Sequence, residues 1–559
     1  MTDLRRTLLW VVFTMSLVML WDAWNRHTGQ PTLFGAPPPK AAAAGAAAPG
    51  AASQAGVPAA AATPSPTASA AVGPVPAAAA RSGPQGQEIV VSTDRVRATF
   101  DTLGGSLVRL ELLNHVDAED RQRRVVLFDR SAERSYAAQS GLITAQPGVA
   151  LPNHWTPLRY VPGPTALAGG ANELQVRFES TEPGVTLAKT YTLRRGDYAI
   201  GVRHEVANAG GAPVAPQLYL QLVRDGNPAR GESKWYFTFT GPAVYTEARK
   251  FEKIDFKDIE KGKASHVTSA SDGWVAMVQH YFTSAWIVPA AGPREFRTQK
   301  VADNLYAVQM VQPLGELAPG ASKAVEATLY AGPQEEYKLA AMAPGLELVK
   351  DYGWFTVLAK PLFWVLDRLH KLIGNWGWAI VALVVLLKVA FYWLNASAYR
   401  SMAKMKALTP RLTDLRERYK DKPQLMQQEM MRIYREEKVN PLGGCLPILA
   451  QMPFFIALYW VLLSSVEMRN APWLGWIHDL STPDPWFILP LLMLASSLLQ
   501  VWLQPTPTDP MQAKMMWIMP IAFGFMFFFF PAGLVLYWLT NNVLSIAQQW
   551  WINKQLGVA

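Results

Sequence analysis

The segment GWAIVALVVLLKVAFYWL, residues 377–394, decides the fold class of this chain. Apart from Lys388 it is almost entirely apolar, and it is long enough to cross a bilayer as a helix. In a straight helix, Lys388 would lie ~18 Å from both Trp376 and Arg400, at ~1.5 Å of rise per residue. A lysine at that depth costs roughly 2.5–3.5 kcal/mol on insertion scales, and such residues are functional by default. The sequence thus predicts a membrane helix over 376–395 with a functional charge inside it.

Apolar runs elsewhere predict a polytopic helical membrane protein with six spans. Five of the spans form a core over 374–552, and those after the first are predicted at 445–465, 486–503, 514–530 and 533–551. An N-terminal run behind Arg5 and Arg6 predicts the first of the six spans within 1–27, as an uncleaved signal anchor or alternatively a cleaved signal peptide. Two tryptophans after this run are typical of the membrane interface and favour the anchor.

The distribution of charge predicts the orientation of these spans. Residues 399–438, between the first two core spans, carry eleven Lys or Arg against six Asp or Glu. Basic segments of this kind stay in the cytoplasm, and the two N-terminal arginines agree with that side. With six spans, both chain ends lie in the cytoplasm, including a short tail over 553–559, and residues 88–333 lie on the opposite side.

Two stretches of different composition precede the core. Residues 28–87 consist mainly of Ala, Pro, Gly and Ser, and they predict a disordered linker. Beyond them, apolar and polar residues alternate in short runs such as SLVRLELL (106–113), separated by Gly and Asn/Asp turns. This period of two predicts a large antiparallel β-sandwich over 88–333. Because Cys445 is the single cysteine of the chain, that domain must be stable without disulfides.

Residues 334–373 predict a helical connector between the β domain and the core. In WFTVLAKPLFWVLDRLHKLI, residues 354–373, apolar residues recur at three- and four-residue spacing, and charged residues fall mainly on other faces. This pattern is typical of an amphipathic helix that lies in the membrane interface. A helix packed on the β domain is the alternative.

The basic segment 399–438 predicts a cytoplasmic helical hairpin within the core. Two amphipathic stripes, separated by a break at residues 421–423, would face each other across the hairpin. Their methionines suit an adaptable surface for varied partners, as well as simple packing of one helix on the other. The candidate contact residues are Met402, Met405, Met426 and Met430.

Lys388 has no carboxylate partner at its depth in the sequence. The apolar runs of the core contain no Asp or Glu over 374–395, 442–466, 485–504 and 511–552. A proton- or cation-coupled transporter would usually place an acid or a histidine there. An ion pair that merely holds two helices together is also excluded within this chain, so the sequence predicts water or another molecule as the partner of Lys388.

Polar side chains at helical spacing predict where that partner binds. Lys388, Tyr392 and Asn395 follow i, i+4 and i+7 along one straight helix, and similar stripes occur in the fourth and sixth spans, the latter continuing to Ser545. Each stripe alone would also fit helix–helix hydrogen bonding. Together they predict a hydrated groove open to the cytoplasm, with candidate residues Lys388, Tyr392, Asn395, Gln451, Ser497, Gln500, Tyr537, Thr540 and Asn541.

The C-terminal part, residues 350–552, resembles the YidC/Oxa family of membrane protein insertases. The resemblance is carried by NWGWAIVALVVLLKVAFYWL (375–394), NPLGGCLPILAQMPFFIALYWVL (440–462) and FPAGLVLYWLTNN (530–542). The whole layout, an anchor helix, a large periplasmic β-sandwich and a five-helix core, is similar to that of the Gram-negative bacterial members.

The resemblance implies an insertase and chaperone of the bacterial inner membrane. Its implied partners are nascent membrane proteins, the Sec translocon, the lipid bilayer and, at the hairpin, a ribosome or targeting receptor. Family members keep a positive residue in a groove open to cytoplasm and lipid, and Lys388 stands at that position, where many relatives have arginine. Lysine keeps the charge but loses the bidentate geometry of a guanidinium. The short tail, with Lys554 as its one basic residue, predicts little ribosome contact there.

The sequence contains no nucleotide-binding loop, metal cluster or nucleophile arrangement. No catalytic residue, cofactor or metal ligand is therefore predicted. The modest net charge of +9 is concentrated beside apolar runs, which favours a membrane face over nucleic acid as a ligand. The alternatives from other classes are a polytopic transporter or channel with a periplasmic binding domain, and a membrane-anchored carbohydrate-active enzyme.

Overall fold

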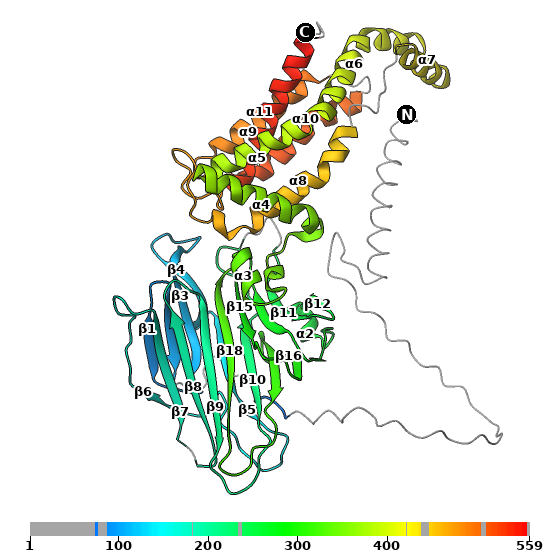
Figure 1. Cartoon of the computed structure of the whole chain (residues 1–559). Helices are drawn as coiled ribbons and strands as arrows, with labels where there is room; N and C mark the ends of the chain where they lie inside the picture. The colour runs from blue at the N-terminus through cyan, green and yellow to red at the C-terminus, as the bar shows by residue number, and fades with distance from the viewer. Residues whose placement is uncertain are drawn as a thin grey trace, which may run out of the picture.

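The computed structural model describes residues 73–76, 86–181, 183–232, 238–420, 422–437, 446–504 and 510–555. The predicted N-terminal anchor, most of the linker and the last four residues of the chain lie outside them. The described residues form a β-sandwich and a bundle of helices, which are drawn one above the other in Figure 1.

Two antiparallel sheets form the sandwich. Among the described residues, the first sheet has nine strands in the spatial order β1-β2-β3-β4-β5-β10-β17-β16-β13, and the second has nine in the order β12-β11-β14-β15-β18-β9-β8-β7-β6. The strands of the first sheet are β1 Glu88–Ser92, β2 Val96–Asp101, β3 Ser106–Val116, β4 Arg124–Arg130, β5 Ser135–Ile143, β10 Gln217–Asp225, β13 Ser269–Ala270, β16 Arg294–Ala302 and β17 Leu305–Pro313. Those of the second are β6 Leu158–Val161, β7 Glu173–Ser180, β8 Val185–Arg194, β9 Ala199–Asn208, β11 Gly241–Thr246, β12 Lys250–Lys253, β14 Trp274–Val278, β15 Phe282–Ile287 and β18 Ser322–Pro333.

The alternation of apolar and polar residues explains why these segments form a sandwich. Along β8, buried residues alternate with partly exposed ones, and the inward side chains of both sheets share one apolar core. On the outer face of the second sheet, Arg177 pairs with Glu179 at 2.8 Å and with Glu205 at 2.6 Å, so polar positions contact each other across strands. The predicted antiparallel β-sandwich is confirmed.

A lysine and a histidine lie inside this sandwich core. Lys189 is fully buried, and its Nζ donates to the backbone carbonyls of Gly104 and Ser140, both at 2.6 Å. The Ser140 hydroxyl lies 2.9 Å from Nε2 of His204. Burial lowers the pKa of Lys189 to about 7. Burial, with the nearby charge of Lys189, lowers the pKa of His204 to about 3.

Residues 73–76 depart from the predicted linker. Gly73 and Val75 contact the first sheet, and Val75 is only 9% exposed. The prediction of disorder is wrong for these four residues, because a single valine in an Ala- and Pro-rich stretch gives no periodic signal of burial.

The bundle is built from one connecting helix and several apolar helices. A short helix in the β domain is α2 Phe256–Glu260, and the connector contains α3 Glu336–Met342, η1 Leu346–Val349 and η2 Gly353–Phe355. The bundle helices are α4 Thr356–Ile373, α5 Trp376–Ala390, α6 Tyr392–Arg418, α7 Pro423–Glu436, α8 Leu446–Ser464, η3 Val466–Met468, α9 Ile488–Leu503, α10 Pro510–Met526, η4 Phe527–Phe529 and α11 Ala532–Gln555.

The predicted amphipathic helix forms as α4, but it does not pack mainly on the β domain. Its buried residues Leu362, Phe363 and Leu366 join the apolar core of the bundle, and α4 contacts α5 and α8. Its other side exposes large apolar residues, with Val357 and Leu372 each 84% exposed.

The predicted straight helix over 376–395 is wrong. The helix ends at Ala390, and α5 and α6 meet at Phe391 with a bend of 69°. Neither Pro nor Gly, the usual causes of a sharp kink, lies near the bend, because Gly377 is in the first turn of α5. Instead, packing accompanies the bend, since the ring of Phe391 contacts that of Phe454 on α8 with centroids 5.0 Å apart. Lys388 and Asn395 therefore do not lie on one face of a straight helix.

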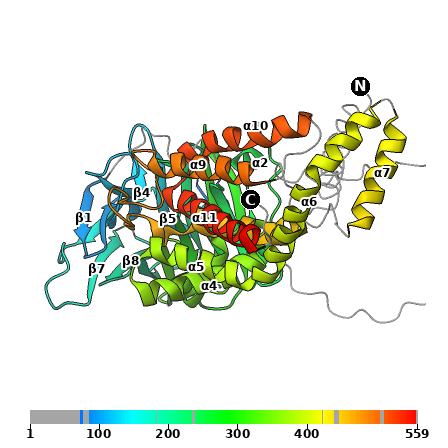
Figure 2. The same cartoon turned by 90° about the horizontal axis from the view of Figure 1, so that it is seen from above.

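No single helix of the described residues has both the length and the apolar composition needed to cross a membrane alone. The bent pair of α5 and the first part of α6 meets those requirements together. Helix α6 also continues into the first arm of the hairpin, so the arm begins at Tyr392 rather than at residue 399. Seen from above, α6 and α7 extend to one side of the other helices (Figure 2).

The loop after α8 joins the bundle to the β domain. Val466 of η3 belongs to the apolar core of the sandwich, and Arg469 donates to the carbonyl of Val116 at 2.7 Å. Lys350, whose side chain is 0% exposed, forms an ion pair with Glu467 at 3.1 Å. These contacts come from both domains, so they fix the β domain against one end of the bundle.

Candidate functional site

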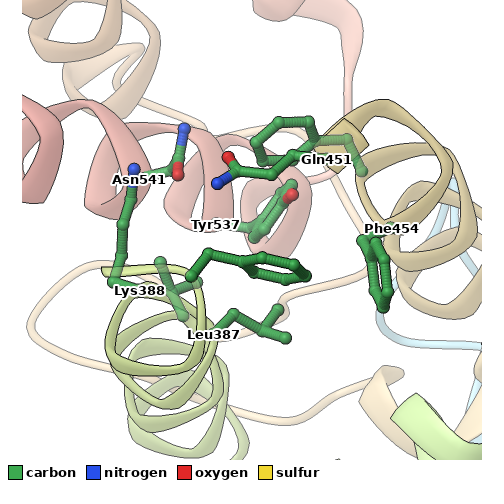
Figure 3. A pocket seen from close by; sticks show the side chains of 9 residues that line it. Leu387, Lys388, Gln451, Phe454, Tyr537 and Asn541 are labelled. Atoms are coloured by element: carbon green, nitrogen blue, oxygen red, sulfur yellow. The ribbon is translucent and has the colours of Figure 1, made fainter. Parts of the chain in front are cut away.

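A cavity lies between α5, α8 and α11, next to the bend at Phe391. It is small and partly open: its space is about 310 Å³ when the solvent at its mouth is included, and Figure 3 shows the side chains around it. Its lining residues are Val384, Leu387, Lys388, Phe391, Gln451, Phe454, Phe455, Tyr537 and Asn541. Four of these carry polar groups, and the remaining five are apolar.

Lys388 lies in the last turn of α5, and its charge meets a neutral acceptor. Its Nζ donates to the hydroxyl of Ser545 on α11 at 2.6 Å, and that hydroxyl donates to the carbonyl of Asn541 at 2.7 Å. Among the described residues, no carboxylate lies within ion-pair distance of Lys388. The sequence predicted water or another molecule as the partner of Lys388, and the structure adds a hydroxyl one helix away that accepts a hydrogen bond from it.

The bend brings a second polar pair to the edge of the cavity. The side chain of Gln451 on α8 donates to Oδ1 of Asn395 at 2.8 Å. The Nδ2 of Asn395 and the hydroxyl of Tyr537 are buried without a protein hydrogen-bond partner among the described residues. Buried polar groups are normally satisfied, so these two groups require water or a bound molecule.

The structure does not bring every predicted groove residue to this cavity. Ser497 accepts a hydrogen bond from Asn542 at 2.9 Å, which ties α9 to α11. The hydroxyl of Thr540 donates to the carbonyl of Leu536 in its own helix at 2.8 Å. Gln500 on α9 does not line the cavity, and neither does Tyr392, whose side chain is exposed.

Several residues in the cavity or beside it were not among the predicted ones. Ser545 continues the predicted stripe on the last span, but the sequence did not identify it as the acceptor for Lys388. Phe454 and Phe455 follow Gln451 at i+3 and i+4, so their place on the same helix face was available from spacing. Nothing in the sequence distinguished them from lipid-facing aromatic residues.

The predicted hairpin contacts lie on α6 and α7. Met402, Met405, Met426 and Met430 are partly buried, and Leu412 and Ile433 are buried. The arms are also joined by Arg411, which pairs with Glu437 at 2.9 Å. Simple packing therefore explains part of both stripes. On the outer side of α7, Leu425 and Met431 are each 42% exposed.

Comparison with known proteins matches both parts of the chain. The family described as YidC periplasmic domain matches residues 88–365, and the family described as 60Kd inner membrane protein matches residues 368–558. The chain is 57% identical to the membrane protein insertase YidC of Cupriavidus taiwanensis, covering 99% of this chain and 98% of that one. It is 52% identical to the membrane protein insertase YidC of Janthinobacterium sp. over the full length of both. The chain belongs to the YidC family of membrane protein insertases.

Two solved structures match this chain with low scores. A crystal structure described as an active YidC insertase with its first transmembrane domain resolved is 20% identical, with a TM-score of 0.38, and covers 85% of this chain and 94% of that chain. A putative aldose 1-epimerase from Escherichia coli covers 44% of this chain with a TM-score of 0.28. These scores are too low to transfer any residue role.

Membership of the YidC family indicates that the cavity belongs to an inner membrane protein. YidC family members are inner membrane proteins with a periplasmic domain, and they are insertases rather than enzymes. The sandwich is the periplasmic part, and all residues that line the cavity fall within the part matched by the 60Kd inner membrane protein family.

Proposed function

We propose that this chain inserts proteins into the bacterial inner membrane by attracting an acidic segment of the substrate to Lys388. The observation that supports this mechanism is the meeting of Lys388 with Gln451, Tyr537 and Asn541 in one cavity. No carboxylate of the described residues neutralises the lysine there. The site thus offers one positive charge and several hydrogen-bonding groups to an incoming chain.

The attraction is large enough to select acidic segments. An ammonium group has three donors, and Lys388 uses one of them to bond Ser545, so further donors can reach a substrate carboxylate. At a separation of ~6 Å and an effective dielectric constant of ~20, the attraction is about 3 kcal/mol. That energy corresponds to roughly a hundredfold preference.

The polar groups around the cavity provide temporary hydrogen bonds. Tyr537 and Asn395 each hold a buried polar atom without a protein partner among the described residues. A substrate backbone in the cavity can satisfy these atoms and have its own polar groups satisfied in turn. This exchange lowers the cost of moving polar residues into the membrane.

Release into lipid is driven by the apolar part of the substrate. Helix α10 exposes Ile518, Phe523 and Phe525, each more than half exposed, and such a face suits contact with lipid and with an apolar helix. Burial of apolar surface contributes about 25 cal/mol per Å². Transfer of an acidic segment to the outside is favoured by the membrane potential, at about 2.3 kcal/mol per charge for 100 mV.

The proposed topology has six membrane spans and follows the basic hairpin. The N-terminal segment 1–27 is the first span and the core 374–552 contains five, with α4 in the interface. The hairpin and both chain ends lie in the cytoplasm. The proposed division of the rest is the linker 28–87, the periplasmic domain 88–333, the connector 334–373 and the tail 553–559.

The hairpin formed by α6 and α7 is the proposed contact for partners in the cytoplasm. Exposed apolar residues on the outer side of α7 lie among basic and acidic groups, which suits a reversible contact with a ribosome or a targeting receptor. The Sec translocon is the proposed partner for larger substrates, beside the bundle in the bilayer.

Reconstitution tests the proposal. Proteoliposomes receive a small single-span substrate with an acidic translocated segment, and insertion is measured by protease protection. Wild type and Lys388→Arg should insert this substrate, whereas Lys388→Glu should lose most insertion. Lys514→Glu is the matched control, because it makes the same charge change at an exposed residue of α10 outside the cavity.

Two outcomes separate failure of the function from failure of the mechanism. Insertion by wild type no better than in empty liposomes would contradict insertion itself. Equal insertion by wild type and Lys388→Glu would leave insertion intact but refute the role of Lys388.

A further inference from the structure

The four residues Gly73–Pro76 lie in a site on the first sheet of the β-sandwich. The amide of Gly73 donates to Oε1 of Gln217 on β10 at 3.0 Å, and its carbonyl accepts from the guanidinium of Arg297 on β16 at 3.0 Å. Both polar groups of one linker residue are thus paired with side chains more than a hundred positions away in sequence. Such pairing is what a specific docking site provides and what a solvated linker lacks.

Val75 supplies the apolar part of the contact. It is 9% exposed and packs in a small cluster with Ile143, Tyr219 and Val311. This cluster is separate from the main core between the two sheets. Its strands β5, β10 and β17 are neighbours in the first sheet, so Val75 covers a patch that the fold builds from three strands.

Glycine is required at the first position of the segment. A Cβ on residue 73 would lie 2.4 Å from the carbonyl oxygen of Thr144, far closer than van der Waals contact. The flanking prolines, Pro74 and Pro76, restrict the backbone to an extended form and lower the entropy lost on docking. The site therefore recognises a glycine and an apolar side chain, in a backbone that the two prolines keep extended.

We infer that this face of the sandwich is a docking site for a Gly-Pro-Val-Pro segment, which the chain fills with its own linker. The docked segment lies over β10, β17 and their neighbours, whereas the sandwich itself begins at the edge strand β1. Docking thus moves the point at which the linker leaves the β domain from the edge of the sheet to its other half. The docked residues divide the linker into two parts. The longer part connects this position on the sheet to the N-terminal segment.

Thiol accessibility in the full-length protein tests this inference. Replacing Cys445, for example by Cys445→Ser, makes an introduced cysteine the single thiol of the chain. Val75→Cys is compared with Val57→Cys, a matched control because Val57 also follows a glycine closely and precedes a proline in the same linker. Maleimide should label Val75→Cys at least ~tenfold more slowly than Val57→Cys, since buried groups react only after local opening.

Second substitutions show whether the site is responsible. Gly73→Ala and Arg297→Ala should each bring the labelling rate of Val75→Cys close to that of Val57→Cys, and Gly56→Ala should change neither rate. Equal labelling of the two cysteines in the otherwise unchanged protein would overturn the inference. So would slow labelling of Val75→Cys that Gly73→Ala leaves unaltered, because the contact would then not depend on this geometry.

Discussion

Lys189 in the β-sandwich and Lys388 in the helical bundle are both held without an ion pair among the described residues, but their surroundings differ. Lys189 is fully enclosed, and two backbone carbonyls fix its Nζ at 2.6 Å each. Lys388 is only partly buried, bonds one movable hydroxyl and borders a cavity. The backbone carbonyls are fixed by the fold and cannot move away from Nζ of Lys189, whereas the serine hydroxyl can rotate away from Lys388. The first arrangement stabilises a fold, and the second leaves a charge available to another molecule.

The same substitution at both lysines should separate these two roles most strongly. Lys189→Met leaves two buried carbonyls without a donor and should destabilise the sandwich by about 2–4 kcal/mol. Lys388→Met should leave the sandwich stable and reduce insertion of acidic substrates roughly tenfold or more, because it removes the attraction in the cavity. Chemical unfolding followed by hydrogen exchange in β8 and β9 measures the first effect, and insertion into proteoliposomes measures the second. Lys263→Met, at an exposed position, is the control. Equal effects of Lys189→Met and Lys388→Met on stability and on insertion would contradict the difference between the two sites.

The pH dependence of stability should reveal the enclosed lysine. Its pKa is about 7 in the folded chain and 10.5 in the unfolded chain, so between these values the unfolded chain binds one more proton. Stability should therefore rise with pH from about 7 toward 10, by up to ~1.4 kcal/mol per pH unit from this group. Unfolding of wild type and Lys189→Met over this range measures the slope. An unchanged slope in the variant would show that Lys189 does not cause it.

His204 should make the sandwich sensitive to acid. Burial lowers its pKa from 6.5 to about 3. Between pH 6.5 and about 3, His204 is therefore protonated in the unfolded chain but neutral in the folded chain. Stability should fall as pH drops from about 6.5 toward 3. His204→Gln should flatten this fall in unfolding experiments. His115 and His280, whose pKa values burial lowers to about 4, should account for the remainder, and an equally steep fall in the variant would contradict the role of His204.

Loss of the hydroxyl partner should have the smallest effect. Ser545→Ala removes the acceptor of Lys388 but leaves its charge beside the cavity, where water can replace the hydroxyl. Insertion should stay within about fivefold of wild type, because the loss of one hydrogen bond, which water can replace, costs about 1 kcal/mol. Ser497→Ala, which loses the bond from Asn542 instead, is the matched control. A loss as large as that of Lys388→Met would show that the bond, rather than the charge, carries the function.

The two regions also differ in how far the sequence could predict them. Alternation along strands such as β8 is local, so the sandwich followed from the pattern. The bend at Phe391 did not, because no Pro or Gly near it indicates a kink and the contact that accompanies it, with Phe454, is distant in sequence. Docking of Val75 was missed because its contacts lie on strands that are distant in sequence.

The candidate site was predicted in part. Four predicted residues, Lys388, Gln451, Tyr537 and Asn541, line one cavity. Helical spacing identified polar stripes but not which neighbour each would meet, so Ser497 was assigned to the groove although it bonds Asn542. A stripe that joins helices and one that lines a cavity have the same period, and only the three-dimensional arrangement distinguishes them.

A charge exchange between the cavity and the substrate tests the central claim most directly. The substrate carries either acidic residues or lysines in its translocated segment, and insertion of each is measured with wild type and Lys388→Glu in proteoliposomes without a membrane potential. If Lys388 attracts the passing segment directly, Lys388→Glu should lose insertion of the acidic substrate and gain insertion of the basic one. Insertion of both substrates in the same proportion by the two proteins would contradict a direct attraction between Lys388 and the passing segment.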